Sequence, residues 1–198
     1  MNTDTKRFVH LYTEASPNPD SLKLVFNFII SPEGRDFNYT RSDDFSSSPL
    51  VKALFDGFPW ISQVFILNNF ITLTRGVQED WYELLSEVKP HLVSWFEEKK
   101  PVFVFESEEG MKAAISTALP ENEIERQIMD VLEEYVKPAV EGDGGAIAFH
   151  SFHDGVVQVE LRGSCSGCPS SALTLKQGIE NLLTRMVPGV REVVALNR

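Results

Sequence analysis

The chain has 198 residues, 42% of them hydrophobic and 24% charged, which excludes wholesale disorder and suits one large or two small folded domains. Its 18 basic and 29 acidic residues give a net charge of −11. A nucleic-acid partner is disfavoured, because an acidic surface repels phosphate backbones. No apolar run approaches the length of a membrane-spanning helix, so no membrane role is expected.

The N-terminal segment has neither the apolar core of a secretory signal nor the Arg-rich, acid-poor composition of a mitochondrial transit peptide. The expected location is the bacterial cytoplasm, although a mature organellar form also fits. The 2 cysteines are too few for a disulfide-built scaffold. In a reducing compartment, a close pair of cysteines indicates metal binding or redox chemistry.

The composition changes along the chain and predicts two domains. All three Trp and most of the Phe lie before residue 106, whereas both Cys lie after residue 160. The segment between Pro101 and Pro120 is rich in acidic and small residues and has weak periodicity, which is typical of a linker. We therefore expect a first domain over residues 1–100, a linker over 101–121 and a second domain over 122–198.

The first region has a mixed α and β pattern. Residues 21–30 are rich in Leu, Val, Phe and Ile and favour a strand, and residues 49–57 favour a short helix. Two β-type runs over 62–75 indicate a hairpin. Residues 81–100 have a helical pattern that Pro90 is expected to divide into two helices. The predicted order is roughly β-β-α-β-β-α, with Phe55, Phe58 and Trp60 expected mainly in the core.

The second region is clearer. A capping pattern at Asn122 begins a helix, which Pro138 and the glycine-rich run 141–145 are expected to end. Later elements follow in order: strands 146–152 and 156–161 joined by a turn, a helix that ends at Pro188-Gly189, and a strand at 190–196. This α-β-β-α-β order predicts a three-stranded sheet with helices packed on it. The fold class is α+β, with two small mixed α/β domains.

The chemistry-bearing motif lies between the second strand and the second helix of this region. Cys165 and Cys168 are separated by two residues, so their sulfurs can share a metal centre or close a disulfide. The start of the following helix is expected to favour thiolate over thiol. Gly163 and Gly167 allow a tight backbone and close approach of a bulky ligand.

The number of ligands narrows the chemistry. A zinc site or an iron–sulfur cluster usually needs four thiolates, or thiolates with His, and this chain supplies two Cys. His150 and His153 do not have zinc-finger spacing and are expected to be ordinary surface or packing residues. A two-fold dimer would supply four thiolates, the number that a [4Fe–4S] cluster requires. The alternatives are a thioredoxin-like dithiol redox protein, although the aromatic residue usual before the first Cys is absent, and a dimeric zinc-binding module.

Longer motifs resemble a known family. The second region is similar to the C-terminal NifU-like (Nfu) domain in the glycine-rich run 142–145, in residues 161–171 and in residues 174–180. The first region resembles the Nfu N-terminal domain more loosely, at residues 16–23, 48–50 and 69–74. Together the two resemblances cover nearly the whole chain, in the domain order of that family.

The resemblance implies an iron–sulfur cluster scaffold or carrier. Proteins of this family hold a [4Fe–4S] cluster between two subunits and pass it to apo-proteins, which implies a homodimer when loaded and an upstream assembly scaffold as donor. Cys165 and Cys168 would be the ligands. The family assigns no catalytic residue, so no enzymatic activity is expected. The glycine-rich run is expected to be mainly a turn, and Asp143 a turn residue and not a ligand.

Overall fold

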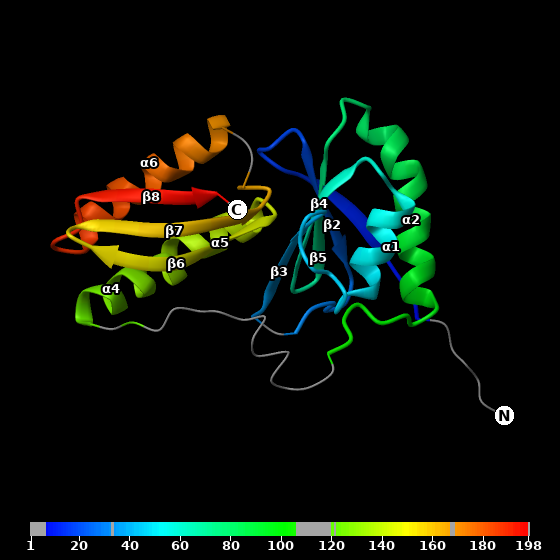
Figure 1. Cartoon of the computed structure of the whole chain (residues 1–198), viewed down its shortest axis with the longest axis horizontal. Coiled ribbons are helices and arrows are strands. Elements are labelled where there is room, and N and C mark those ends of the chain that lie inside the picture. The colour runs from blue at the N-terminus through cyan, green and yellow to red at the C-terminus, as the bar shows by residue number, and fades with distance from the viewer. Residues whose placement is uncertain (1–6, 33, 106–119, 121, 167–168, 198) are drawn as a thin grey trace.

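The computed structural model describes residues 7–32, 34–105, 120, 122–166 and 169–197. Two domains lie side by side in Figure 1, one built on a five-stranded sheet and the other on a three-stranded sheet. The α+β class with two small mixed domains is confirmed.

The N-terminal sheet is wholly antiparallel, in the order β1-β2-β5-β4-β3. Its strands are β1 (Leu11–Ala15), β2 (Ser21–Phe26), β3 (Asp36–Thr40), β4 (Ile61–Leu67) and β5 (Phe70–Arg75). The expected hairpin is present, with Asn68 in the left-handed region at φ 48°. Three strands precede the first helix where two were expected, since the edge strands β1 and β3 have no continuous apolar run.

Two helices cover one face of this sheet (Figure 1). Helix α1 (Pro49–Gly57) begins where expected, with the Ser48 hydroxyl accepting a hydrogen bond from the backbone N–H of Val51. Helix α2 (Trp81–Glu97) runs unbroken through Pro90, so the predicted division into two helices is wrong.

Burial explains why α2 continues. A proline inside a helix costs about 3 kcal/mol. Four side chains spaced four residues apart on α2 are almost fully buried against the sheet and α1: Leu84, Val88, Leu92 and Phe96. Each contributes roughly 1.5–3 kcal/mol on burial, so their sum exceeds the cost of Pro90.

Residues that follow α2 also pack on the N-terminal domain. The Val102 carbonyl accepts a hydrogen bond from the Ser48 hydroxyl, and the rings of Phe103 and Phe37 lie 4.1 Å apart between centroids. Phe105 contacts the same core. The packed N-terminal unit therefore includes residues up to Phe105.

The C-terminal domain begins with a helical segment that includes a π turn. Helix α4 (Glu123–Val131) continues into the π-helical turn η1 (Leu132–Val136) and then into α5 (Lys137–Gly142). The segment therefore passes Pro138, which was expected to end it. Pro138 stands in the first turn of α5, directly after the π turn, where the missing N–H of a proline costs little. The glycine-rich run ends the segment as expected.

The C-terminal sheet has the order β6-β7-β8. Strands β6 (Gly145–His153) and β7 (Val156–Gly163) form an antiparallel hairpin, whose turn residues Asp154 and Gly155 have φ values of 49° and 80°. Helix α6 (Pro169–Met186) crosses over to β8 (Glu192–Asn197), which pairs parallel with β7. The predicted α-β-β-α-β order is confirmed.

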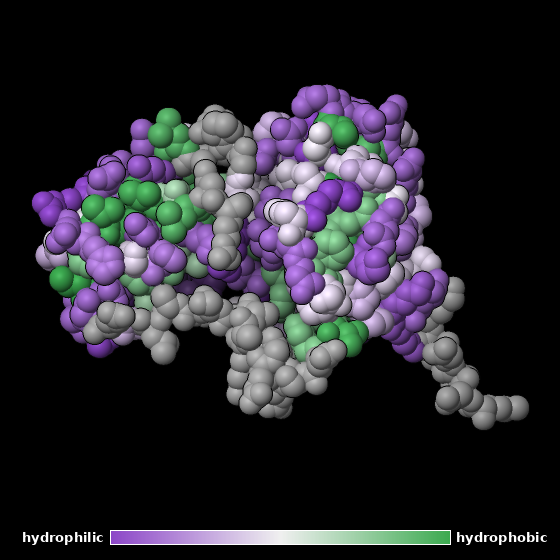
Figure 2. Space-filling view, viewed as in Figure 1, coloured by the Kyte–Doolittle hydropathy of each residue, from purple (hydrophilic) through white to green (hydrophobic). Residues whose placement is uncertain are grey.

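The helices of the C-terminal domain cover one face of its sheet. Alternate residues of β7 face them: Val157, Val159 and Leu161, all fully buried. From α6, Ile179 and Leu183 complete this core, while Met186 is 42% exposed. The other face is turned to the viewer, and Figure 2 shows hydrophobic residues gathered there among hydrophilic ones.

Candidate metal-binding site

The loop that carries Cys165 leaves the end of β7 through a tight turn. Gly163 has a φ of 66°, and its carbonyl accepts hydrogen bonds from the backbone N–H and the hydroxyl of Ser166, at 3.1 and 2.9 Å. The expectation that Gly163 allows a tight backbone is confirmed. Cys168, the second predicted ligand, and Gly167 lie outside the described residues, so the approach of the two sulfurs stays a prediction.

The glycine-rich run forms the wall against which this loop packs. Gly144 has a φ of 86°, which confirms the expected turn. Gly145 has a different role, because a Cβ placed there would lie 2.8 Å from the Cys165 Sγ and 2.5 Å from the Arg162 carbonyl oxygen. The missing side chain at Gly145 therefore makes room for the cysteine.

Asp143 and Ser164 join this wall to the loop. The Ser164 hydroxyl donates a hydrogen bond of 2.7 Å to the backbone carbonyl of Asp143, and its backbone N–H donates to the Gly144 carbonyl at 3.3 Å. Asp143 follows the last residue of α5 as its C-cap. Its observed contact with the loop is made by the backbone, in keeping with the expected turn role.

The Cys165 side chain is only 7% exposed. Burial raises the pKa of the Cys165 thiol; a hydrogen bond with Ser164 lowers it, and the negative charge of Asp143 adds to the increase. The helix start was expected to favour the thiolate. At Cys165 the observed direction is the opposite one, because desolvation is the largest effect on its pKa.

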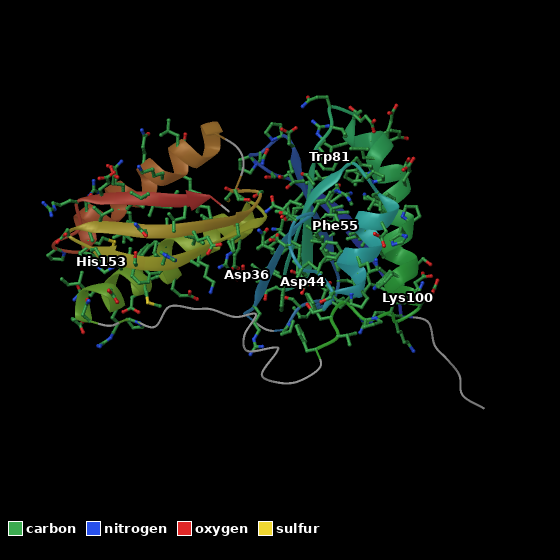
Figure 3. The ribbon with its side chains drawn as sticks, in the orientation of Figure 1. Asp36, Asp44, Phe55, Trp81, Lys100 and His153 are labelled. Carbon is green, nitrogen blue, oxygen red and sulfur yellow. The ribbon has the colours of Figure 1, made fainter. Side chains whose placement is uncertain are left out.

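The alternative histidine ligands are far from this loop. His150 and His153 are exposed, and His153 lies near the tip of the β6–β7 hairpin, away from the junction between the domains (Figure 3). Within the part of the chain that the structure describes, no three His, Cys, Asp or Glu side chains form a metal-binding group. The geometry therefore offers Cys165 no histidine partner from the strand or the turn.

The N-terminal domain touches the loop directly. The Asn18 side chain donates a hydrogen bond to the Ser164 carbonyl at 3.1 Å, and the Gln63 side chain donates to the Ser166 hydroxyl at 3.0 Å. Ser164 and Ser166 are 2% and 7% exposed. The residues on both sides of Cys165 are therefore held by the other domain.

Sequence reasoning missed these N-terminal contacts. Phe55, Phe58 and Trp60 are core residues, as expected. Asn18 meets the loop from the turn between β1 and β2, and Gln63 lies on the sheet face opposite the helices, where Gln63 and Thr72 alternate with helix-facing apolar neighbours. This alternation was visible in the sequence, but it does not indicate which surface a sheet face meets.

Comparison with known proteins identifies the family of this chain. The sequence model of the NifU-like domain matches residues 128–194, and that of the Nfu/NifU scaffold-protein N-terminal domain matches residues 11–99. The human protein called NFU1 iron-sulfur cluster scaffold homolog, mitochondrial, is 32% identical over 94% of this chain and 72% of its own length. The chain belongs to the Nfu family.

Other Nfu proteins resemble this chain to about the same degree. The Drosophila persimilis protein with the same name is 32% identical over 95% of this chain and 65% of its own length. This chain spans about two thirds of the length of such relatives. A solution NMR structure of a NifU-like protein from Saccharomyces cerevisiae is less similar, with a TM-score of 0.45 and 19% identity over 52% of this chain and 89% of that chain.

The names of the relatives can be compared with the cellular location expected from the sequence. Their names place them in mitochondria, so the comparisons give no support to the expected bacterial cytoplasm, and the organellar alternative agrees with the relatives. Among the described residues, no helix is both long and apolar enough to cross a bilayer.

Proposed function

We propose that the chain is an iron–sulfur cluster scaffold or carrier. Two copies would hold one [4Fe–4S] cluster through Cys165 and Cys168 of each, and would pass it to apo-proteins. The observation that carries this proposal is the Cys-x-x-Cys loop between β7 and α6, in a family whose relatives are named as cluster scaffolds.

The thiolate count supports sharing between subunits. The chain has 2 cysteines, whereas a [4Fe–4S] cluster takes four thiolates. The exposed histidines are remote from the loop, so a second copy of the pair is the simplest source of the missing ligands. The loaded form is then a homodimer, and an upstream assembly scaffold would donate the cluster. Iron and sulfide are cargo in this scheme, and no enzymatic activity is proposed.

The raised pKa of the Cys165 thiol affects how a metal can bind. Metal ligands must be thiolates, and burial keeps the Cys165 pKa above its ordinary value. Loading must therefore release a proton.

Anaerobic reconstitution with iron and sulfide tests the proposal. We expect a brown dimer with about four irons per pair of chains, since the cubane has that composition. Cys165→Ser and Cys168→Ser should each abolish it, and the matched controls His150→Ala and His153→Ala should retain it. The loaded protein should then restore activity to an apo-enzyme that depends on a [4Fe–4S] cluster.

Two outcomes would reject the proposal. If the cysteine variants bind iron at full stoichiometry, the ligands are wrong. If freshly purified anaerobic protein instead holds one zinc per dimer, with Zn–S distances near 2.3 Å, the site is a structural zinc module. Insulin reduction that needs both cysteines, without cluster formation, would point to the dithiol redox alternative.

A further inference from the structure

We propose that the N-terminal domain covers the cysteine loop of its own chain. The sheet face opposite its helices docks on residues 163–166. This closed form cannot form the dimer in which two chains share one cluster. The inference rests on the proposed function, which requires the loop to meet a second copy. The inference gives the sheet face opposite the helices a binding partner, which is the cysteine loop of the same chain.

Hydrogen bonds join the docking face to the C-terminal domain at several points. Thr72 donates through its hydroxyl to the Gly144 carbonyl at 2.7 Å. Lys23 donates to the carbonyls of Glu141 and Gly142, both at 3.1 Å. The Asn18 and Gln63 contacts to Ser164 and Ser166 add to these bonds. We define the docking set by its residues: Asn18, Lys23, Gln63 and Thr72.

Charge and apolar packing add to these bonds. Asp36 lies on β3 at the domain junction (Figure 3), and its carboxylate pairs with the Arg162 guanidinium at 2.8 Å. Beside this pair, one buried apolar cluster crosses the junction and is made of Val25, Phe65, Leu67, Phe70 and Ala146, of which only Ala146 belongs to the C-terminal domain. The contact therefore buries apolar, polar and charged groups together.

The two surfaces fit closely at glycines. A Cβ at Gly144 would lie 2.8 Å from the Thr72 hydroxyl oxygen, and a Cβ at Gly163 would lie 2.9 Å from the Phe65 ring. Both distances are shorter than ordinary van der Waals contact, so a side chain at either position would disturb the contact between the domains, and at Gly163 it would also meet the Gly144 carbonyl oxygen of its own domain at 2.8 Å. These glycines belong to the family motifs, and here they admit side chains of the N-terminal domain.

In the docked form, the described space beside Cys165 is small. The cavity beside the Cys165 sulfur has a volume of about 40 Å³ and is lined by Pro17 and Asn18 of the N-terminal domain as well as by Asp143, Ser164, Cys165 and Leu175. Such a space holds a water molecule or so. A cluster of eight iron and sulfur atoms with two further thiolates is much larger than this space, so on this proposal the N-terminal domain leaves the loop before loading.

Opening is physically accessible. The docking set makes polar contacts, and water can replace these hydrogen bonds when the domains separate. Opening also exposes the apolar cluster around Phe65 and Phe70, which adds to its cost, and contacts between domains within one chain nonetheless allow relative motion. Cluster binding by two copies would then shift the population to the open form, because only that form binds.

Thiol alkylation tests closure without any cluster. In full-length Cys168→Ser protein, Cys165 is the only remaining thiol, since the chain has 2 cysteines. Two proteins are compared: the Cys168→Ser protein, and the same protein with Gln63→Ala and Thr72→Val. Mass spectrometry measures how fast iodoacetamide alkylates Cys165 in each. The double change should accelerate alkylation by roughly tenfold or more, because both substitutions remove hydrogen bonds to the C-terminal domain that only the closed form makes, whereas the bond from Gln63 to Asn38 within the N-terminal domain is lost in both forms.

Thr13→Val is the matched control. Thr13 of β1 stands opposite Leu24, which faces the helices, so the same chemical change is made on the other face of the same sheet. Its alkylation rate should equal that of the background. X-ray scattering provides a second measurement, with a larger radius of gyration for the double variant at unchanged circular dichroism.

The outcomes separate this inference from the proposed function. An unchanged alkylation rate and radius in the folded double variant would overturn closure, even if all proteins load clusters. A faster rate with no cluster in any protein would support closure and reject the carrier function. With both cysteines present, closure predicts that the double variant loads faster than wild type to the same final iron content.

Discussion

Gly145→Ala tests the packing of the cysteine loop most sharply. A methyl group there would lie 2.5 Å from the Arg162 carbonyl oxygen and 2.8 Å from the Cys165 sulfur. The carbonyl is part of the β6–β7 ladder, where Gly145 pairs with Gly163, so relief requires the backbone to move. Overpacking of this kind costs about 1–3 kcal/mol, and we expect a loss near the upper end.

Urea unfolding followed by far-UV circular dichroism measures this loss. Gly142→Ala is the matched control, because a Cβ at Gly142 meets no atom within 4 Å and Gly142 is the last residue of α5. Its stability should stay unchanged or rise by up to about 1 kcal/mol. If Gly145→Ala lies within about 0.5 kcal/mol of wild type, the role assigned to Gly145 is wrong.

Three further substitutions address other features. Gly178→Ala, inside α6 with no atom within 4 Å of the new Cβ, should raise the free energy of unfolding by up to about 1 kcal/mol, and a loss in urea titration would contradict this. Burial lowers the pKa of His91, with a smaller effect from Lys100, so the contribution of neutral His91 to stability is complete above pH 6.5 and declines below it. His91→Gln should therefore flatten the fall in melting temperature between pH 7 and 5. An unchanged slope would refute the assignment. Asp36→Asn should accelerate Cys165 alkylation at low salt and less at high salt, whereas a salt-independent effect would exclude the ion pair as its cause.

Local signals predicted much of the fold, because several elements are fixed by neighbouring residues. Ser48 caps α1, Asn122 caps α4, and Asp154-Gly155 adopts the positive φ values that its hairpin turn requires. Pro90 misled the prediction because burial of distant side chains on α2 outweighs the cost of the missing N–H. Such tertiary compensation cannot be read from a local pattern.

The candidate site was predictable only in part. The spacing of Cys165 and Cys168 is a sequence property, but Cys165 packs in the core of its own domain, and the serines beside it bond to Asn18 and Gln63, which lie 146 and 103 residues from them in the chain. The raised pKa of Cys165 was not visible in the sequence, since desolvation arises from tertiary packing. No periodicity in either domain encodes that contact.

Native mass spectrometry of the anaerobically reconstituted protein tests the central claim most directly. The account predicts one species with the mass of two chains and a single [4Fe–4S] cluster, and only apo monomer when Cys165 and Cys168 are both replaced by Ser. A cluster retained on a single chain, or on the chain without either thiol, would contradict the claim that each copy supplies half of the ligands.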